Sequence, residues 1–319
     1  MIDADLLLSR SRRPLVLGIG GGGDVVGAFA TAEACRLRGA EPVVGGVTWE
    51  RRPIDPRPGP RSESEIERAR RLAVGVLAAS AGTRVRESGV IFAESRMAEL
   101  LGEETVLVDA TLGPAQLADG LAAAVASLGA DLIVFVDVGG DALAHGDEPG
   151  LASPLCDAVM LATAARLAEG AAPVLGGIFG IGCDGELTPA EVLARLAEVG
   201  AAGGLAGARG LTPAVAQRLE QAVKAVPTEA SAQALRCFRG EIGPSAIREG
   251  RRTVELSPAG ALTFYFDPLA ALRSAARLAA AVMDAGDLDA ANEILHGLGV
   301  QTELDYERDA LHTVRQRSN

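Results

Sequence analysis

The chain has 319 residues, 48% of them hydrophobic, and a formal net charge of −12. The acidic balance argues against nucleic acid and anionic membrane surfaces as partners, because both attract basic faces. No apolar run approaches the roughly 18 residues of a transmembrane helix, and the N-terminal residues lack the basic start of a secretory signal. Four widely spaced cysteines form no Cys-x-x-Cys pair, so we expect a reduced, cytoplasmic protein.

Strand-like runs alternate with helical patterns along most of the chain. We predict strands at 15–18, 42–48, 90–92, 106–109, 132–138 and 173–178. We predict helices at 25–38, 63–79, 95–101, 114–128, 154–168, 189–199 and 213–225. The last four of these open with proline. This order predicts an α/β fold of three layers, Rossmann-like, with a mostly parallel sheet and helices on both faces.

The end of the chain departs from this alternation. Two short strand runs within 252–266 flank residues 257–260 and predict a hairpin. Segments 268–284 and 288–298 predict a helical pair, and 305–314 predicts a last helix. We therefore divide the chain into an α/β ligand-binding core at 1–250 and a hairpin with a helical C-terminal extension at 251–319. The extension is expected to pack on the core and offers a contact for a homo-oligomer.

A glycine-rich loop, Gly-Ile-Gly-Gly-Gly-Gly at 18–23, lies between the first predicted strand and helix. Its spacing fits Gly-x-Gly-x-x-Gly, a dinucleotide fingerprint, and the N–H groups of a helix start favour an anion. We expect a ligand to touch Gly20, Gly21, Gly22, Gly23 and Asp24. Asp24 either caps the helix or binds a metal-bridged phosphate or a substrate amine. No lysine follows the glycines, which excludes a Walker loop.

Polar residues follow several predicted strands, at the edge where open parallel sheets bind ligands. They are Asp24, Trp49, Glu50, Asp109, Thr111, Asp137, Asp141, Asp184 and Glu186. Trp49, Glu50 and Arg51 are candidate ligand contacts, and Glu50 stands where NAD-binding folds place the acid that binds ribose. Residues 51–61 hold four prolines and four arginines and predict an irregular loop, either solvated or offering Arg51 or Arg52 to phosphate or carboxylate.

The densest acidic stretch is Asp137-Val-Gly-Gly-Asp141, followed by His145-Gly-Asp147-Glu148. Carboxylates with one imidazole suit a divalent cation, Mg²⁺ or Mn²⁺. We expect Asp137, Asp141 and Asp147 to ligate metal, and Asp137, Asp141 and His145 to act in catalysis. Gly139, Gly140 and Asp184 complete the predicted ligand contacts. The alternative is that these acids cap a turn and a helix in a solvated loop.

Four segments together resemble a known family: LGIGGGGDVVGA, VTWERRPIDPRPGPRS, VDVGGDALAHGDEPGLASPLCDAVMLA and GCDGEL. The chain is similar over nearly its whole length to a prokaryotic family catalogued as domain of unknown function 1152. The resemblance implies that 18–24, 49–61 and 137–157 are hallmark segments of the family.

These observations favour a cytoplasmic enzyme that acts on a small anionic metabolite or nucleotide by hydrolysis or group transfer. In this hypothesis the glycine loop binds phosphate or carboxylate, and the aspartates bind metal or act as acid and base. One alternative is an NAD(P)-dependent oxidoreductase that uses Glu50. The other is a non-catalytic ligand-binding or accessory protein of a biosynthetic pathway.

Overall fold

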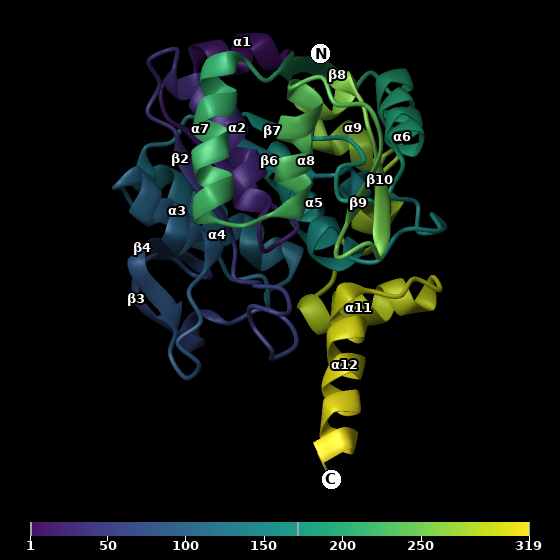
Figure 1. Cartoon of the computed structure of the whole chain (residues 1–319). Coiled ribbons are helices and arrows are strands. Elements are labelled where there is room, and N and C mark those ends of the chain that lie inside the picture. Colours follow the sequence, from purple (N-terminus) through teal and green to yellow (C-terminus); the bar gives the residue numbers. More distant parts are fainter. Residues whose placement is uncertain (1, 171, 319) are drawn as a thin grey trace.

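The computed structural model describes residues 2–170 and 172–318, the last six of these by their backbone alone (Figure 1). Nine strands form one mixed sheet. Their order is β3 (Ile66–Ala73), β4 (Val76–Val85), β5 (Thr105–Val108), β2 (Val43–Val47), β1 (Pro14–Gly18), β6 (Leu132–Val138), β7 (Val174–Phe179), β11 (Leu262–Phe266) and β8 (Leu205–Gly210). The five central strands, from β5 to β7, are parallel. The predicted α/β fold with a mostly parallel sheet is confirmed.

Helices cover both faces of the sheet, and each face has its own core. One face carries α1 (Ala4–Arg10), α2 (Asp24–Arg36), α3 (Ala93–Leu101), α7 (Pro213–Ala225) and α8 (Glu229–Phe238). The other carries α4 (Pro114–Leu128), α5 (Pro154–Ala168), α6 (Pro189–Ala201), α9 (Pro268–Leu272), α10 (Arg277–Ala281) and α11 (Leu288–Gly297). In β1, Leu15 and Leu17 point to the core that contains α4 and α5, and Val16 points to the core that contains α2 and α7. Alternate side chains of a strand point to opposite faces of its sheet. The far end of α12 (Glu303–Ser318) projects from the body (Figure 1).

The four predicted proline openings are all helix starts. Thr188 caps α6 by accepting a hydrogen bond from the N–H of Glu191, and Thr212 caps α7 in the same way through Val215. Proline at the first helical position loses no hydrogen bond there and already has a helical φ. Within the described residues, no helix combines the length and the apolar composition that a membrane span requires.

Two local predictions at the sheet edge are wrong. Residues 63–79 do not form a helix: after a short 3-10 turn they form β3 and the start of β4, an antiparallel pair that turns at Gly75, where φ is +69°. Pairing of β4 with β5 and burial of Val76 override the helical spacing of the charges. Residues 90–92 do not form a strand, since only an isolated bridge joins Ile91 to Arg84. The irregular loop at 51–61 is confirmed.

The predicted hairpin within 252–266 is also wrong. Its first strand, β10 (Arg252–Leu256), pairs with β9 (Gly243–Ile247) in a separate two-stranded sheet. Its second strand, β11, enters the main sheet between β7 and β8, because the 3-10 turn at Pro258–Ala261 separates the two runs. Residues 251–319 therefore contribute a strand to the main sheet. The predicted helix at 268–284 is two short helices, α9 and α10.

Candidate functional site

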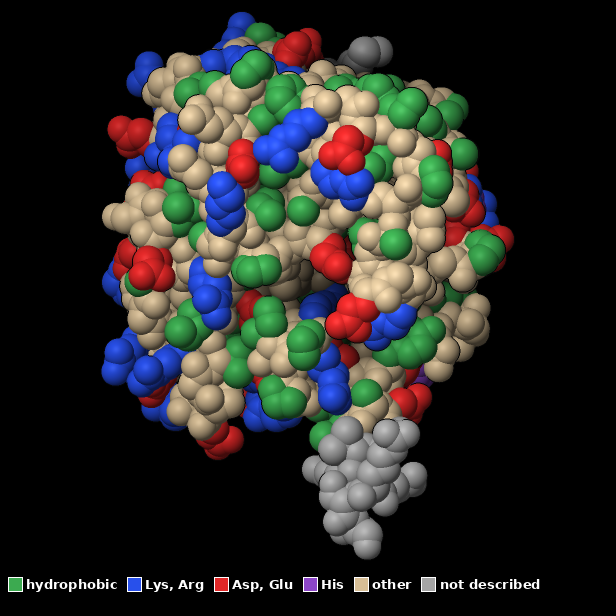
Figure 2. Space-filling model, viewed as in Figure 1, with side chains coloured by type: hydrophobic (Ala, Val, Ile, Leu, Met, Phe, Trp, Pro, Cys, Tyr) green, Lys and Arg blue, Asp and Glu red, His purple; other side chains and the backbone are tan. Residues whose placement is uncertain are grey.

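The site lies where the chain order of the parallel sheet reverses. From β1, the sheet continues to β2 on one side and to β6 on the other, and ligands in such sheets bind beyond the carboxyl ends of these strands. A cavity of about 890 Å³ opens there. It is lined by the glycine loop, the segments after β6 and β7, the starts of α5 and α8, the turn between β9 and β10, and the start of α12. Figure 2 shows the molecular face hollowed, with basic and acidic side chains at the rim.

Three buried or partly buried aspartates meet in this cavity. One carboxylate oxygen each of Asp24, Asp137 and Asp157 lies within 4.8 Å of the others, and we call this group the aspartate triad. The register of β1 against β6 explains the meeting: Gly18 pairs with Val136, so Asp137 arrives beside the glycine loop. Asp24 is the first residue of α2, and Asp157 lies in the first turn of α5. Three different elements thus bring their acids together.

Protein groups satisfy the triad only in part. Asp24 accepts a hydrogen bond from the N–H of Gly20 (2.9 Å), and Asp137 accepts one from the N–H of Ala142 (3.0 Å). Asp157 is 2% exposed, and its Oδ1 has no hydrogen-bond partner among the residues that the structure describes. The alternative that Asp24 caps its helix is wrong, because Gly23 occupies the cap position and no side chain caps α2. A buried oxygen without a partner is costly unless a ligand supplies one.

The glycine loop is packed against these carboxylates. A Cβ on Gly20 would lie 2.6 Å from Asp24 Oδ2 and 2.9 Å from Asp157 Oδ2, so a larger residue there would displace the two carboxylates. The N–H of Gly20 is already bonded to Asp24, and the N–H of Gly22 donates to the carbonyl oxygen of Trp49 (2.8 Å). Two loop donors that a dinucleotide phosphate would use are therefore occupied. The loop therefore packs against Asp24 and Asp157 and leaves fewer N–H groups for a phosphate.

A second acidic group borders the first. Oxygens of Asp141, Asp184 and Glu186 also lie within 4.8 Å of one another. Asp184 Oδ1 is buried without a partner in the described part of the chain, whereas Glu186 accepts from the N–H groups of Ala152 and Ser153 (2.8 Å each). Glu186 also pairs with Arg252, the first residue of β10, and with Arg248 in the turn before it (3.2 and 3.7 Å). This second group is thus partly neutralised by the protein itself.

Burial and mutual repulsion raise the pKa of the cavity acids. Burial is the larger cause in each case. It raises the pKa of Asp24 to about 7 and that of Asp184 to about 8. The pKa values of Asp137, Asp141 and Asp157 lie well above the ordinary range, with neighbouring carboxylates as the next cause. Such a site favours either protons or a bound cation.

Arginines do not balance this charge. Among the described residues, ten acidic side chains and five arginines line the cavity. One of the five, Arg51, bonds to the carbonyl oxygen of Gly20 and to Glu303 (3.1 Å), and stacks on Trp49 at 4.2 Å. Glu303 in turn accepts from the N–H groups of Leu155 and Cys156 (3.0 Å each). Arg51 therefore joins the glycine loop to α12 and α5.

The structure brings most of the predicted site residues together. Nine of them line the cavity: Gly20, Gly21, Gly22, Gly23, Asp24, Arg51, Asp137, Asp141 and Asp184. Trp49, Glu50, Gly139, Gly140, His145 and Asp147 are not among its lining residues. Sequence reasoning missed Asp157, Arg248 and Arg252. Asp157 carried two signals: it ends the hallmark segment 137–157, and it is an acid within the apolar run Leu-Cys-Asp-Ala-Val-Met-Leu.

Trp49 and Glu50 have other partners in the interior. The Trp49 side chain is fully buried, and its Nε1 donates to Glu307 (3.1 Å). Glu50 accepts from the N–H of Ala93 at the start of α3, and burial raises its pKa to about 7. Glu50, the acid that we expected to bind ribose, is thus hydrogen-bonded to the first residue of α3.

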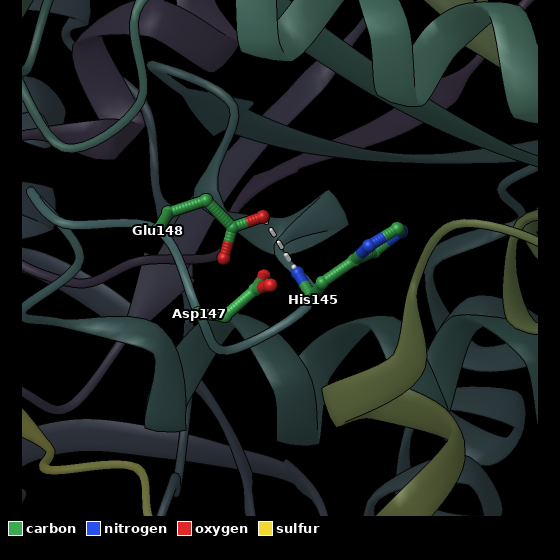
Figure 3. Close-up of side chains that lie close together, drawn as sticks. All are labelled: His145, Asp147 and Glu148. Carbon is green, nitrogen blue, oxygen red and sulfur yellow. Dashed lines mark hydrogen bonds between the residues drawn. The ribbon is translucent and has the colours of Figure 1, made fainter.

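His145 and Asp147 belong to a different cluster, with Glu148, which we call the outer cluster (Figure 3). Glu148 accepts from the N–H groups of His145 and Gly146 (2.8 Å each) and pairs with Arg195 (3.0 Å). His145 Nε2 lies 3.0 Å from Glu198, a second partner of Arg195. The expectation that His145 and Asp147 join Asp137 and Asp141 in one site is not met.

The matched family agrees with the resemblance. A sequence model of the family described as "Protein of unknown function (DUF1152)" matches residues 15–311. The chain belongs to the DUF1152 family. All the residues that line the cavity of this DUF1152 member lie within the matched range. No curated protein and no solved structure matches the chain.

Proposed function

We propose that this protein is a cytoplasmic, divalent-metal-dependent enzyme that hydrolyses a small anionic metabolite or nucleotide, or transfers a group from it. The observation that carries the proposal is the aspartate triad with its unpartnered, buried Asp157 oxygen. All three ligands would be carboxylates, which hard cations such as Mg²⁺ and Mn²⁺ prefer.

Each residue has a distinct role in this proposal. Asp24, Asp137 and Asp157 hold the cation, and the glycine loop lets Asp24 and Asp157 approach each other. A divalent ion held there would activate water and polarise an oxygen of the substrate. Asp141 and Asp184 line the same cavity and stand ready to accept or donate a proton.

The excess of acid in the cavity also supports a cation. A cavity with twice as many acids as arginines favours a cation over an anion, and a metal ion held there would add positive charge that attracts an anionic substrate. The NAD(P) alternative needs Glu50 to bind ribose, but Glu50 accepts a hydrogen bond from the start of α3 and does not line the cavity. A non-catalytic binding protein remains an outcome of the test.

The test is a screen of phosphate esters and diphosphates for turnover, with and without Mn²⁺. The wild-type protein, Asp157→Asn and Asp147→Asn are compared. We expect turnover of at least one substrate that requires Mn²⁺, is lost in Asp157→Asn and persists in Asp147→Asn. Turnover that persists in Asp157→Asn contradicts the metal role. Ligand binding without turnover across the panel supports the binding protein instead.

A further inference from the structure

We propose that the turn between β9 and β10 binds a phosphate group of the ligand, with Arg248 and Arg252 as its guanidinium donors. The inference rests on the proposed function, because this turn lines the same cavity as the triad that would hold the metal ion. The hairpin lies outside the main sheet, yet Ile247, Arg248, Glu249, Arg251 and Arg252 all line the cavity. Three of its side chains are therefore cations facing a site that is otherwise acidic.

The body of the protein holds this turn in place. The N–H of Arg248 donates to both oxygens of Glu229 (3.0 and 2.9 Å), in the first turn of α8. Arg252 packs over Gly185, where an added Cβ would lie 3.6 Å from the Arg252 Cβ. The backbone of the turn and the stem of Arg252 are thus held in place, which reduces the ordering that a ligand must impose.

The backbone of the turn is unusual for the residues that it carries. Arg248 has φ +51° and Glu249 has φ +58°, a region that L-residues avoid and glycine enters freely. Glycine at position 248 would make the same turn with less strain. Residues with strained backbone often cluster at functional sites. At position 248 the chain carries an arginine where glycine would fit the backbone conformation with less strain.

The two arginines have hydrogen-bond donors to offer. Arg252 Nη1 and Arg248 Nη2 approach the same oxygen of Glu186, at 3.2 and 3.7 Å. Glu186 already accepts two backbone N–H groups, and Arg252 Nη1 makes no hydrogen bond with the residues that the structure describes. A guanidinium group carries five donors, and because Arg252 Nη1 is buried beside Glu186, the donors open to an incoming oxyanion are the remaining ones that face the cavity.

These features define the ligand chemically. Paired guanidinium forks suit the several oxygens of a phosphate, and a metal ion held by Asp24, Asp137 and Asp157 in the same cavity would supply further positive charge for such a group. The cavity of about 890 Å³ has room for a molecule of nucleotide size. We therefore assign phosphorylated compounds, either monoesters or diphosphates, as the ligand class.

Calorimetric titration with inorganic pyrophosphate in excess Mg²⁺ tests this assignment. Arg248→Gly and Arg252→Met are compared with the wild type and with Arg273→Ala, a change at an exposed arginine that does not line the cavity. We expect each turn variant to lose about tenfold or more in pyrophosphate affinity, and Arg273→Ala to lose nothing. The thermal midpoint of Arg248→Gly should be unchanged or higher, because glycine relieves the strain.

Two further titrations separate the possible failures. Mn²⁺ alone should bind all four proteins with affinities within about twofold, since the turn holds no triad residue. Failure of the wild type to bind Mn²⁺ overturns the proposed function. Wild-type pyrophosphate affinity in both turn variants, or no pyrophosphate binding by the metal-loaded wild type, overturns this inference. Malonate binding as tightly as pyrophosphate overturns the assignment to phosphate.

Discussion

Of the three groups of described residues that meet the distance condition for holding a cation, the outer cluster and the aspartate triad have opposite surroundings. In the outer cluster, Arg195 supplies the positive charge, and Glu148 is fully hydrogen-bonded. In the aspartate triad, Asp157 has an oxygen with no partner in the described chain. The comparison teaches that spacing of ligands alone does not identify a metal site. In our proposal, the group that holds the cation is the one whose charge the protein does not neutralise.

The pKa shifts follow the same division. Burial alone would raise the pKa of Glu148, but hydrogen bonds from His145, Gly146 and Arg195 lower it below the ordinary value. Burial raises the pKa of Asp24 to about 7, and the hydrogen bond from Gly20 only moderates that. The surroundings of Glu148 thus favour its charged form, whereas burial in the triad favours the protonated form of Asp24.

The largest effect that we expect comes from removing one triad ligand. Asp157→Asn should weaken Mn²⁺ binding by about 100-fold or more, since even outer-shell partners of metal ligands contribute about 10–100-fold. Asp147→Asn is the matched change in the outer cluster and should leave the affinity within about twofold. Equilibrium dialysis measures both. Equal losses in the two variants would erase the distinction between the clusters.

The next effect concerns stability rather than metal affinity. Arg195→Ala removes the cation of the outer cluster and leaves Glu148, which is 7% exposed, without its charged partner. We expect a loss of about 2 kcal/mol in the free energy of unfolding, with Mn²⁺ affinity unchanged. Urea denaturation and dialysis measure the two quantities. A rise in Mn²⁺ affinity would place the cation in the outer cluster instead, because the change removes the positive charge that competes for Glu148.

A glycine substitution tests the packing of the loop on the triad. In Gly20→Ala, the new Cβ would lie 2.6 Å from Asp24 Oδ2, so the carboxylates must separate. We expect about tenfold weaker Mn²⁺ binding and a loss of about 1–3 kcal/mol in stability. The control is Gly200→Ala in α6, where the nearest atom would be 3.8 Å away. If both variants bind Mn²⁺ as the wild type does, the loop does not shape the site.

The smallest effect is a dependence on pH in the metal-free protein. The pKa of Asp24 is raised from 3.8 to about 7, so the folded state binds the extra proton and loses stability as the pH rises between these values. Asp24→Asn avoids this loss. We expect the variant to be more stable than the wild type by up to about 1 kcal/mol at pH 8, with the gap closing toward pH 4. Thermal denaturation across this range measures the gap, and a gap that widens toward acid pH would contradict the assignment.

Much of the fold could be predicted because it is encoded locally. Central strands such as β6 are continuous apolar runs, and prolines mark the starts of α4 to α7. The errors fall where distant pairing decides. Residues 63–79 carry charges at helical spacing but become strands against β5, and β11 pairs with β7 and β8 rather than with its neighbour β10.

The site could be predicted in part for the same reason. Asp24, Asp137, Asp141 and Asp184 follow strands, and parallel strands carry the residues at their ends to one edge. Asp157 was missed because it lies inside a helix whose start happens to face that edge. The prediction put His145 and Asp147 in the wrong site because their neighbour Glu148 binds Arg195, 47 residues further along the chain. No local sequence pattern predicts a pair so far apart.

The most direct measurement of the central claim is anomalous diffraction from a crystal of the wild-type protein soaked in Mn²⁺. The account predicts a peak within coordination distance, about 2.0–2.6 Å, of Asp24, Asp137 and Asp157. A peak in the outer cluster beside His145 and Glu148, with none at the triad, would contradict it.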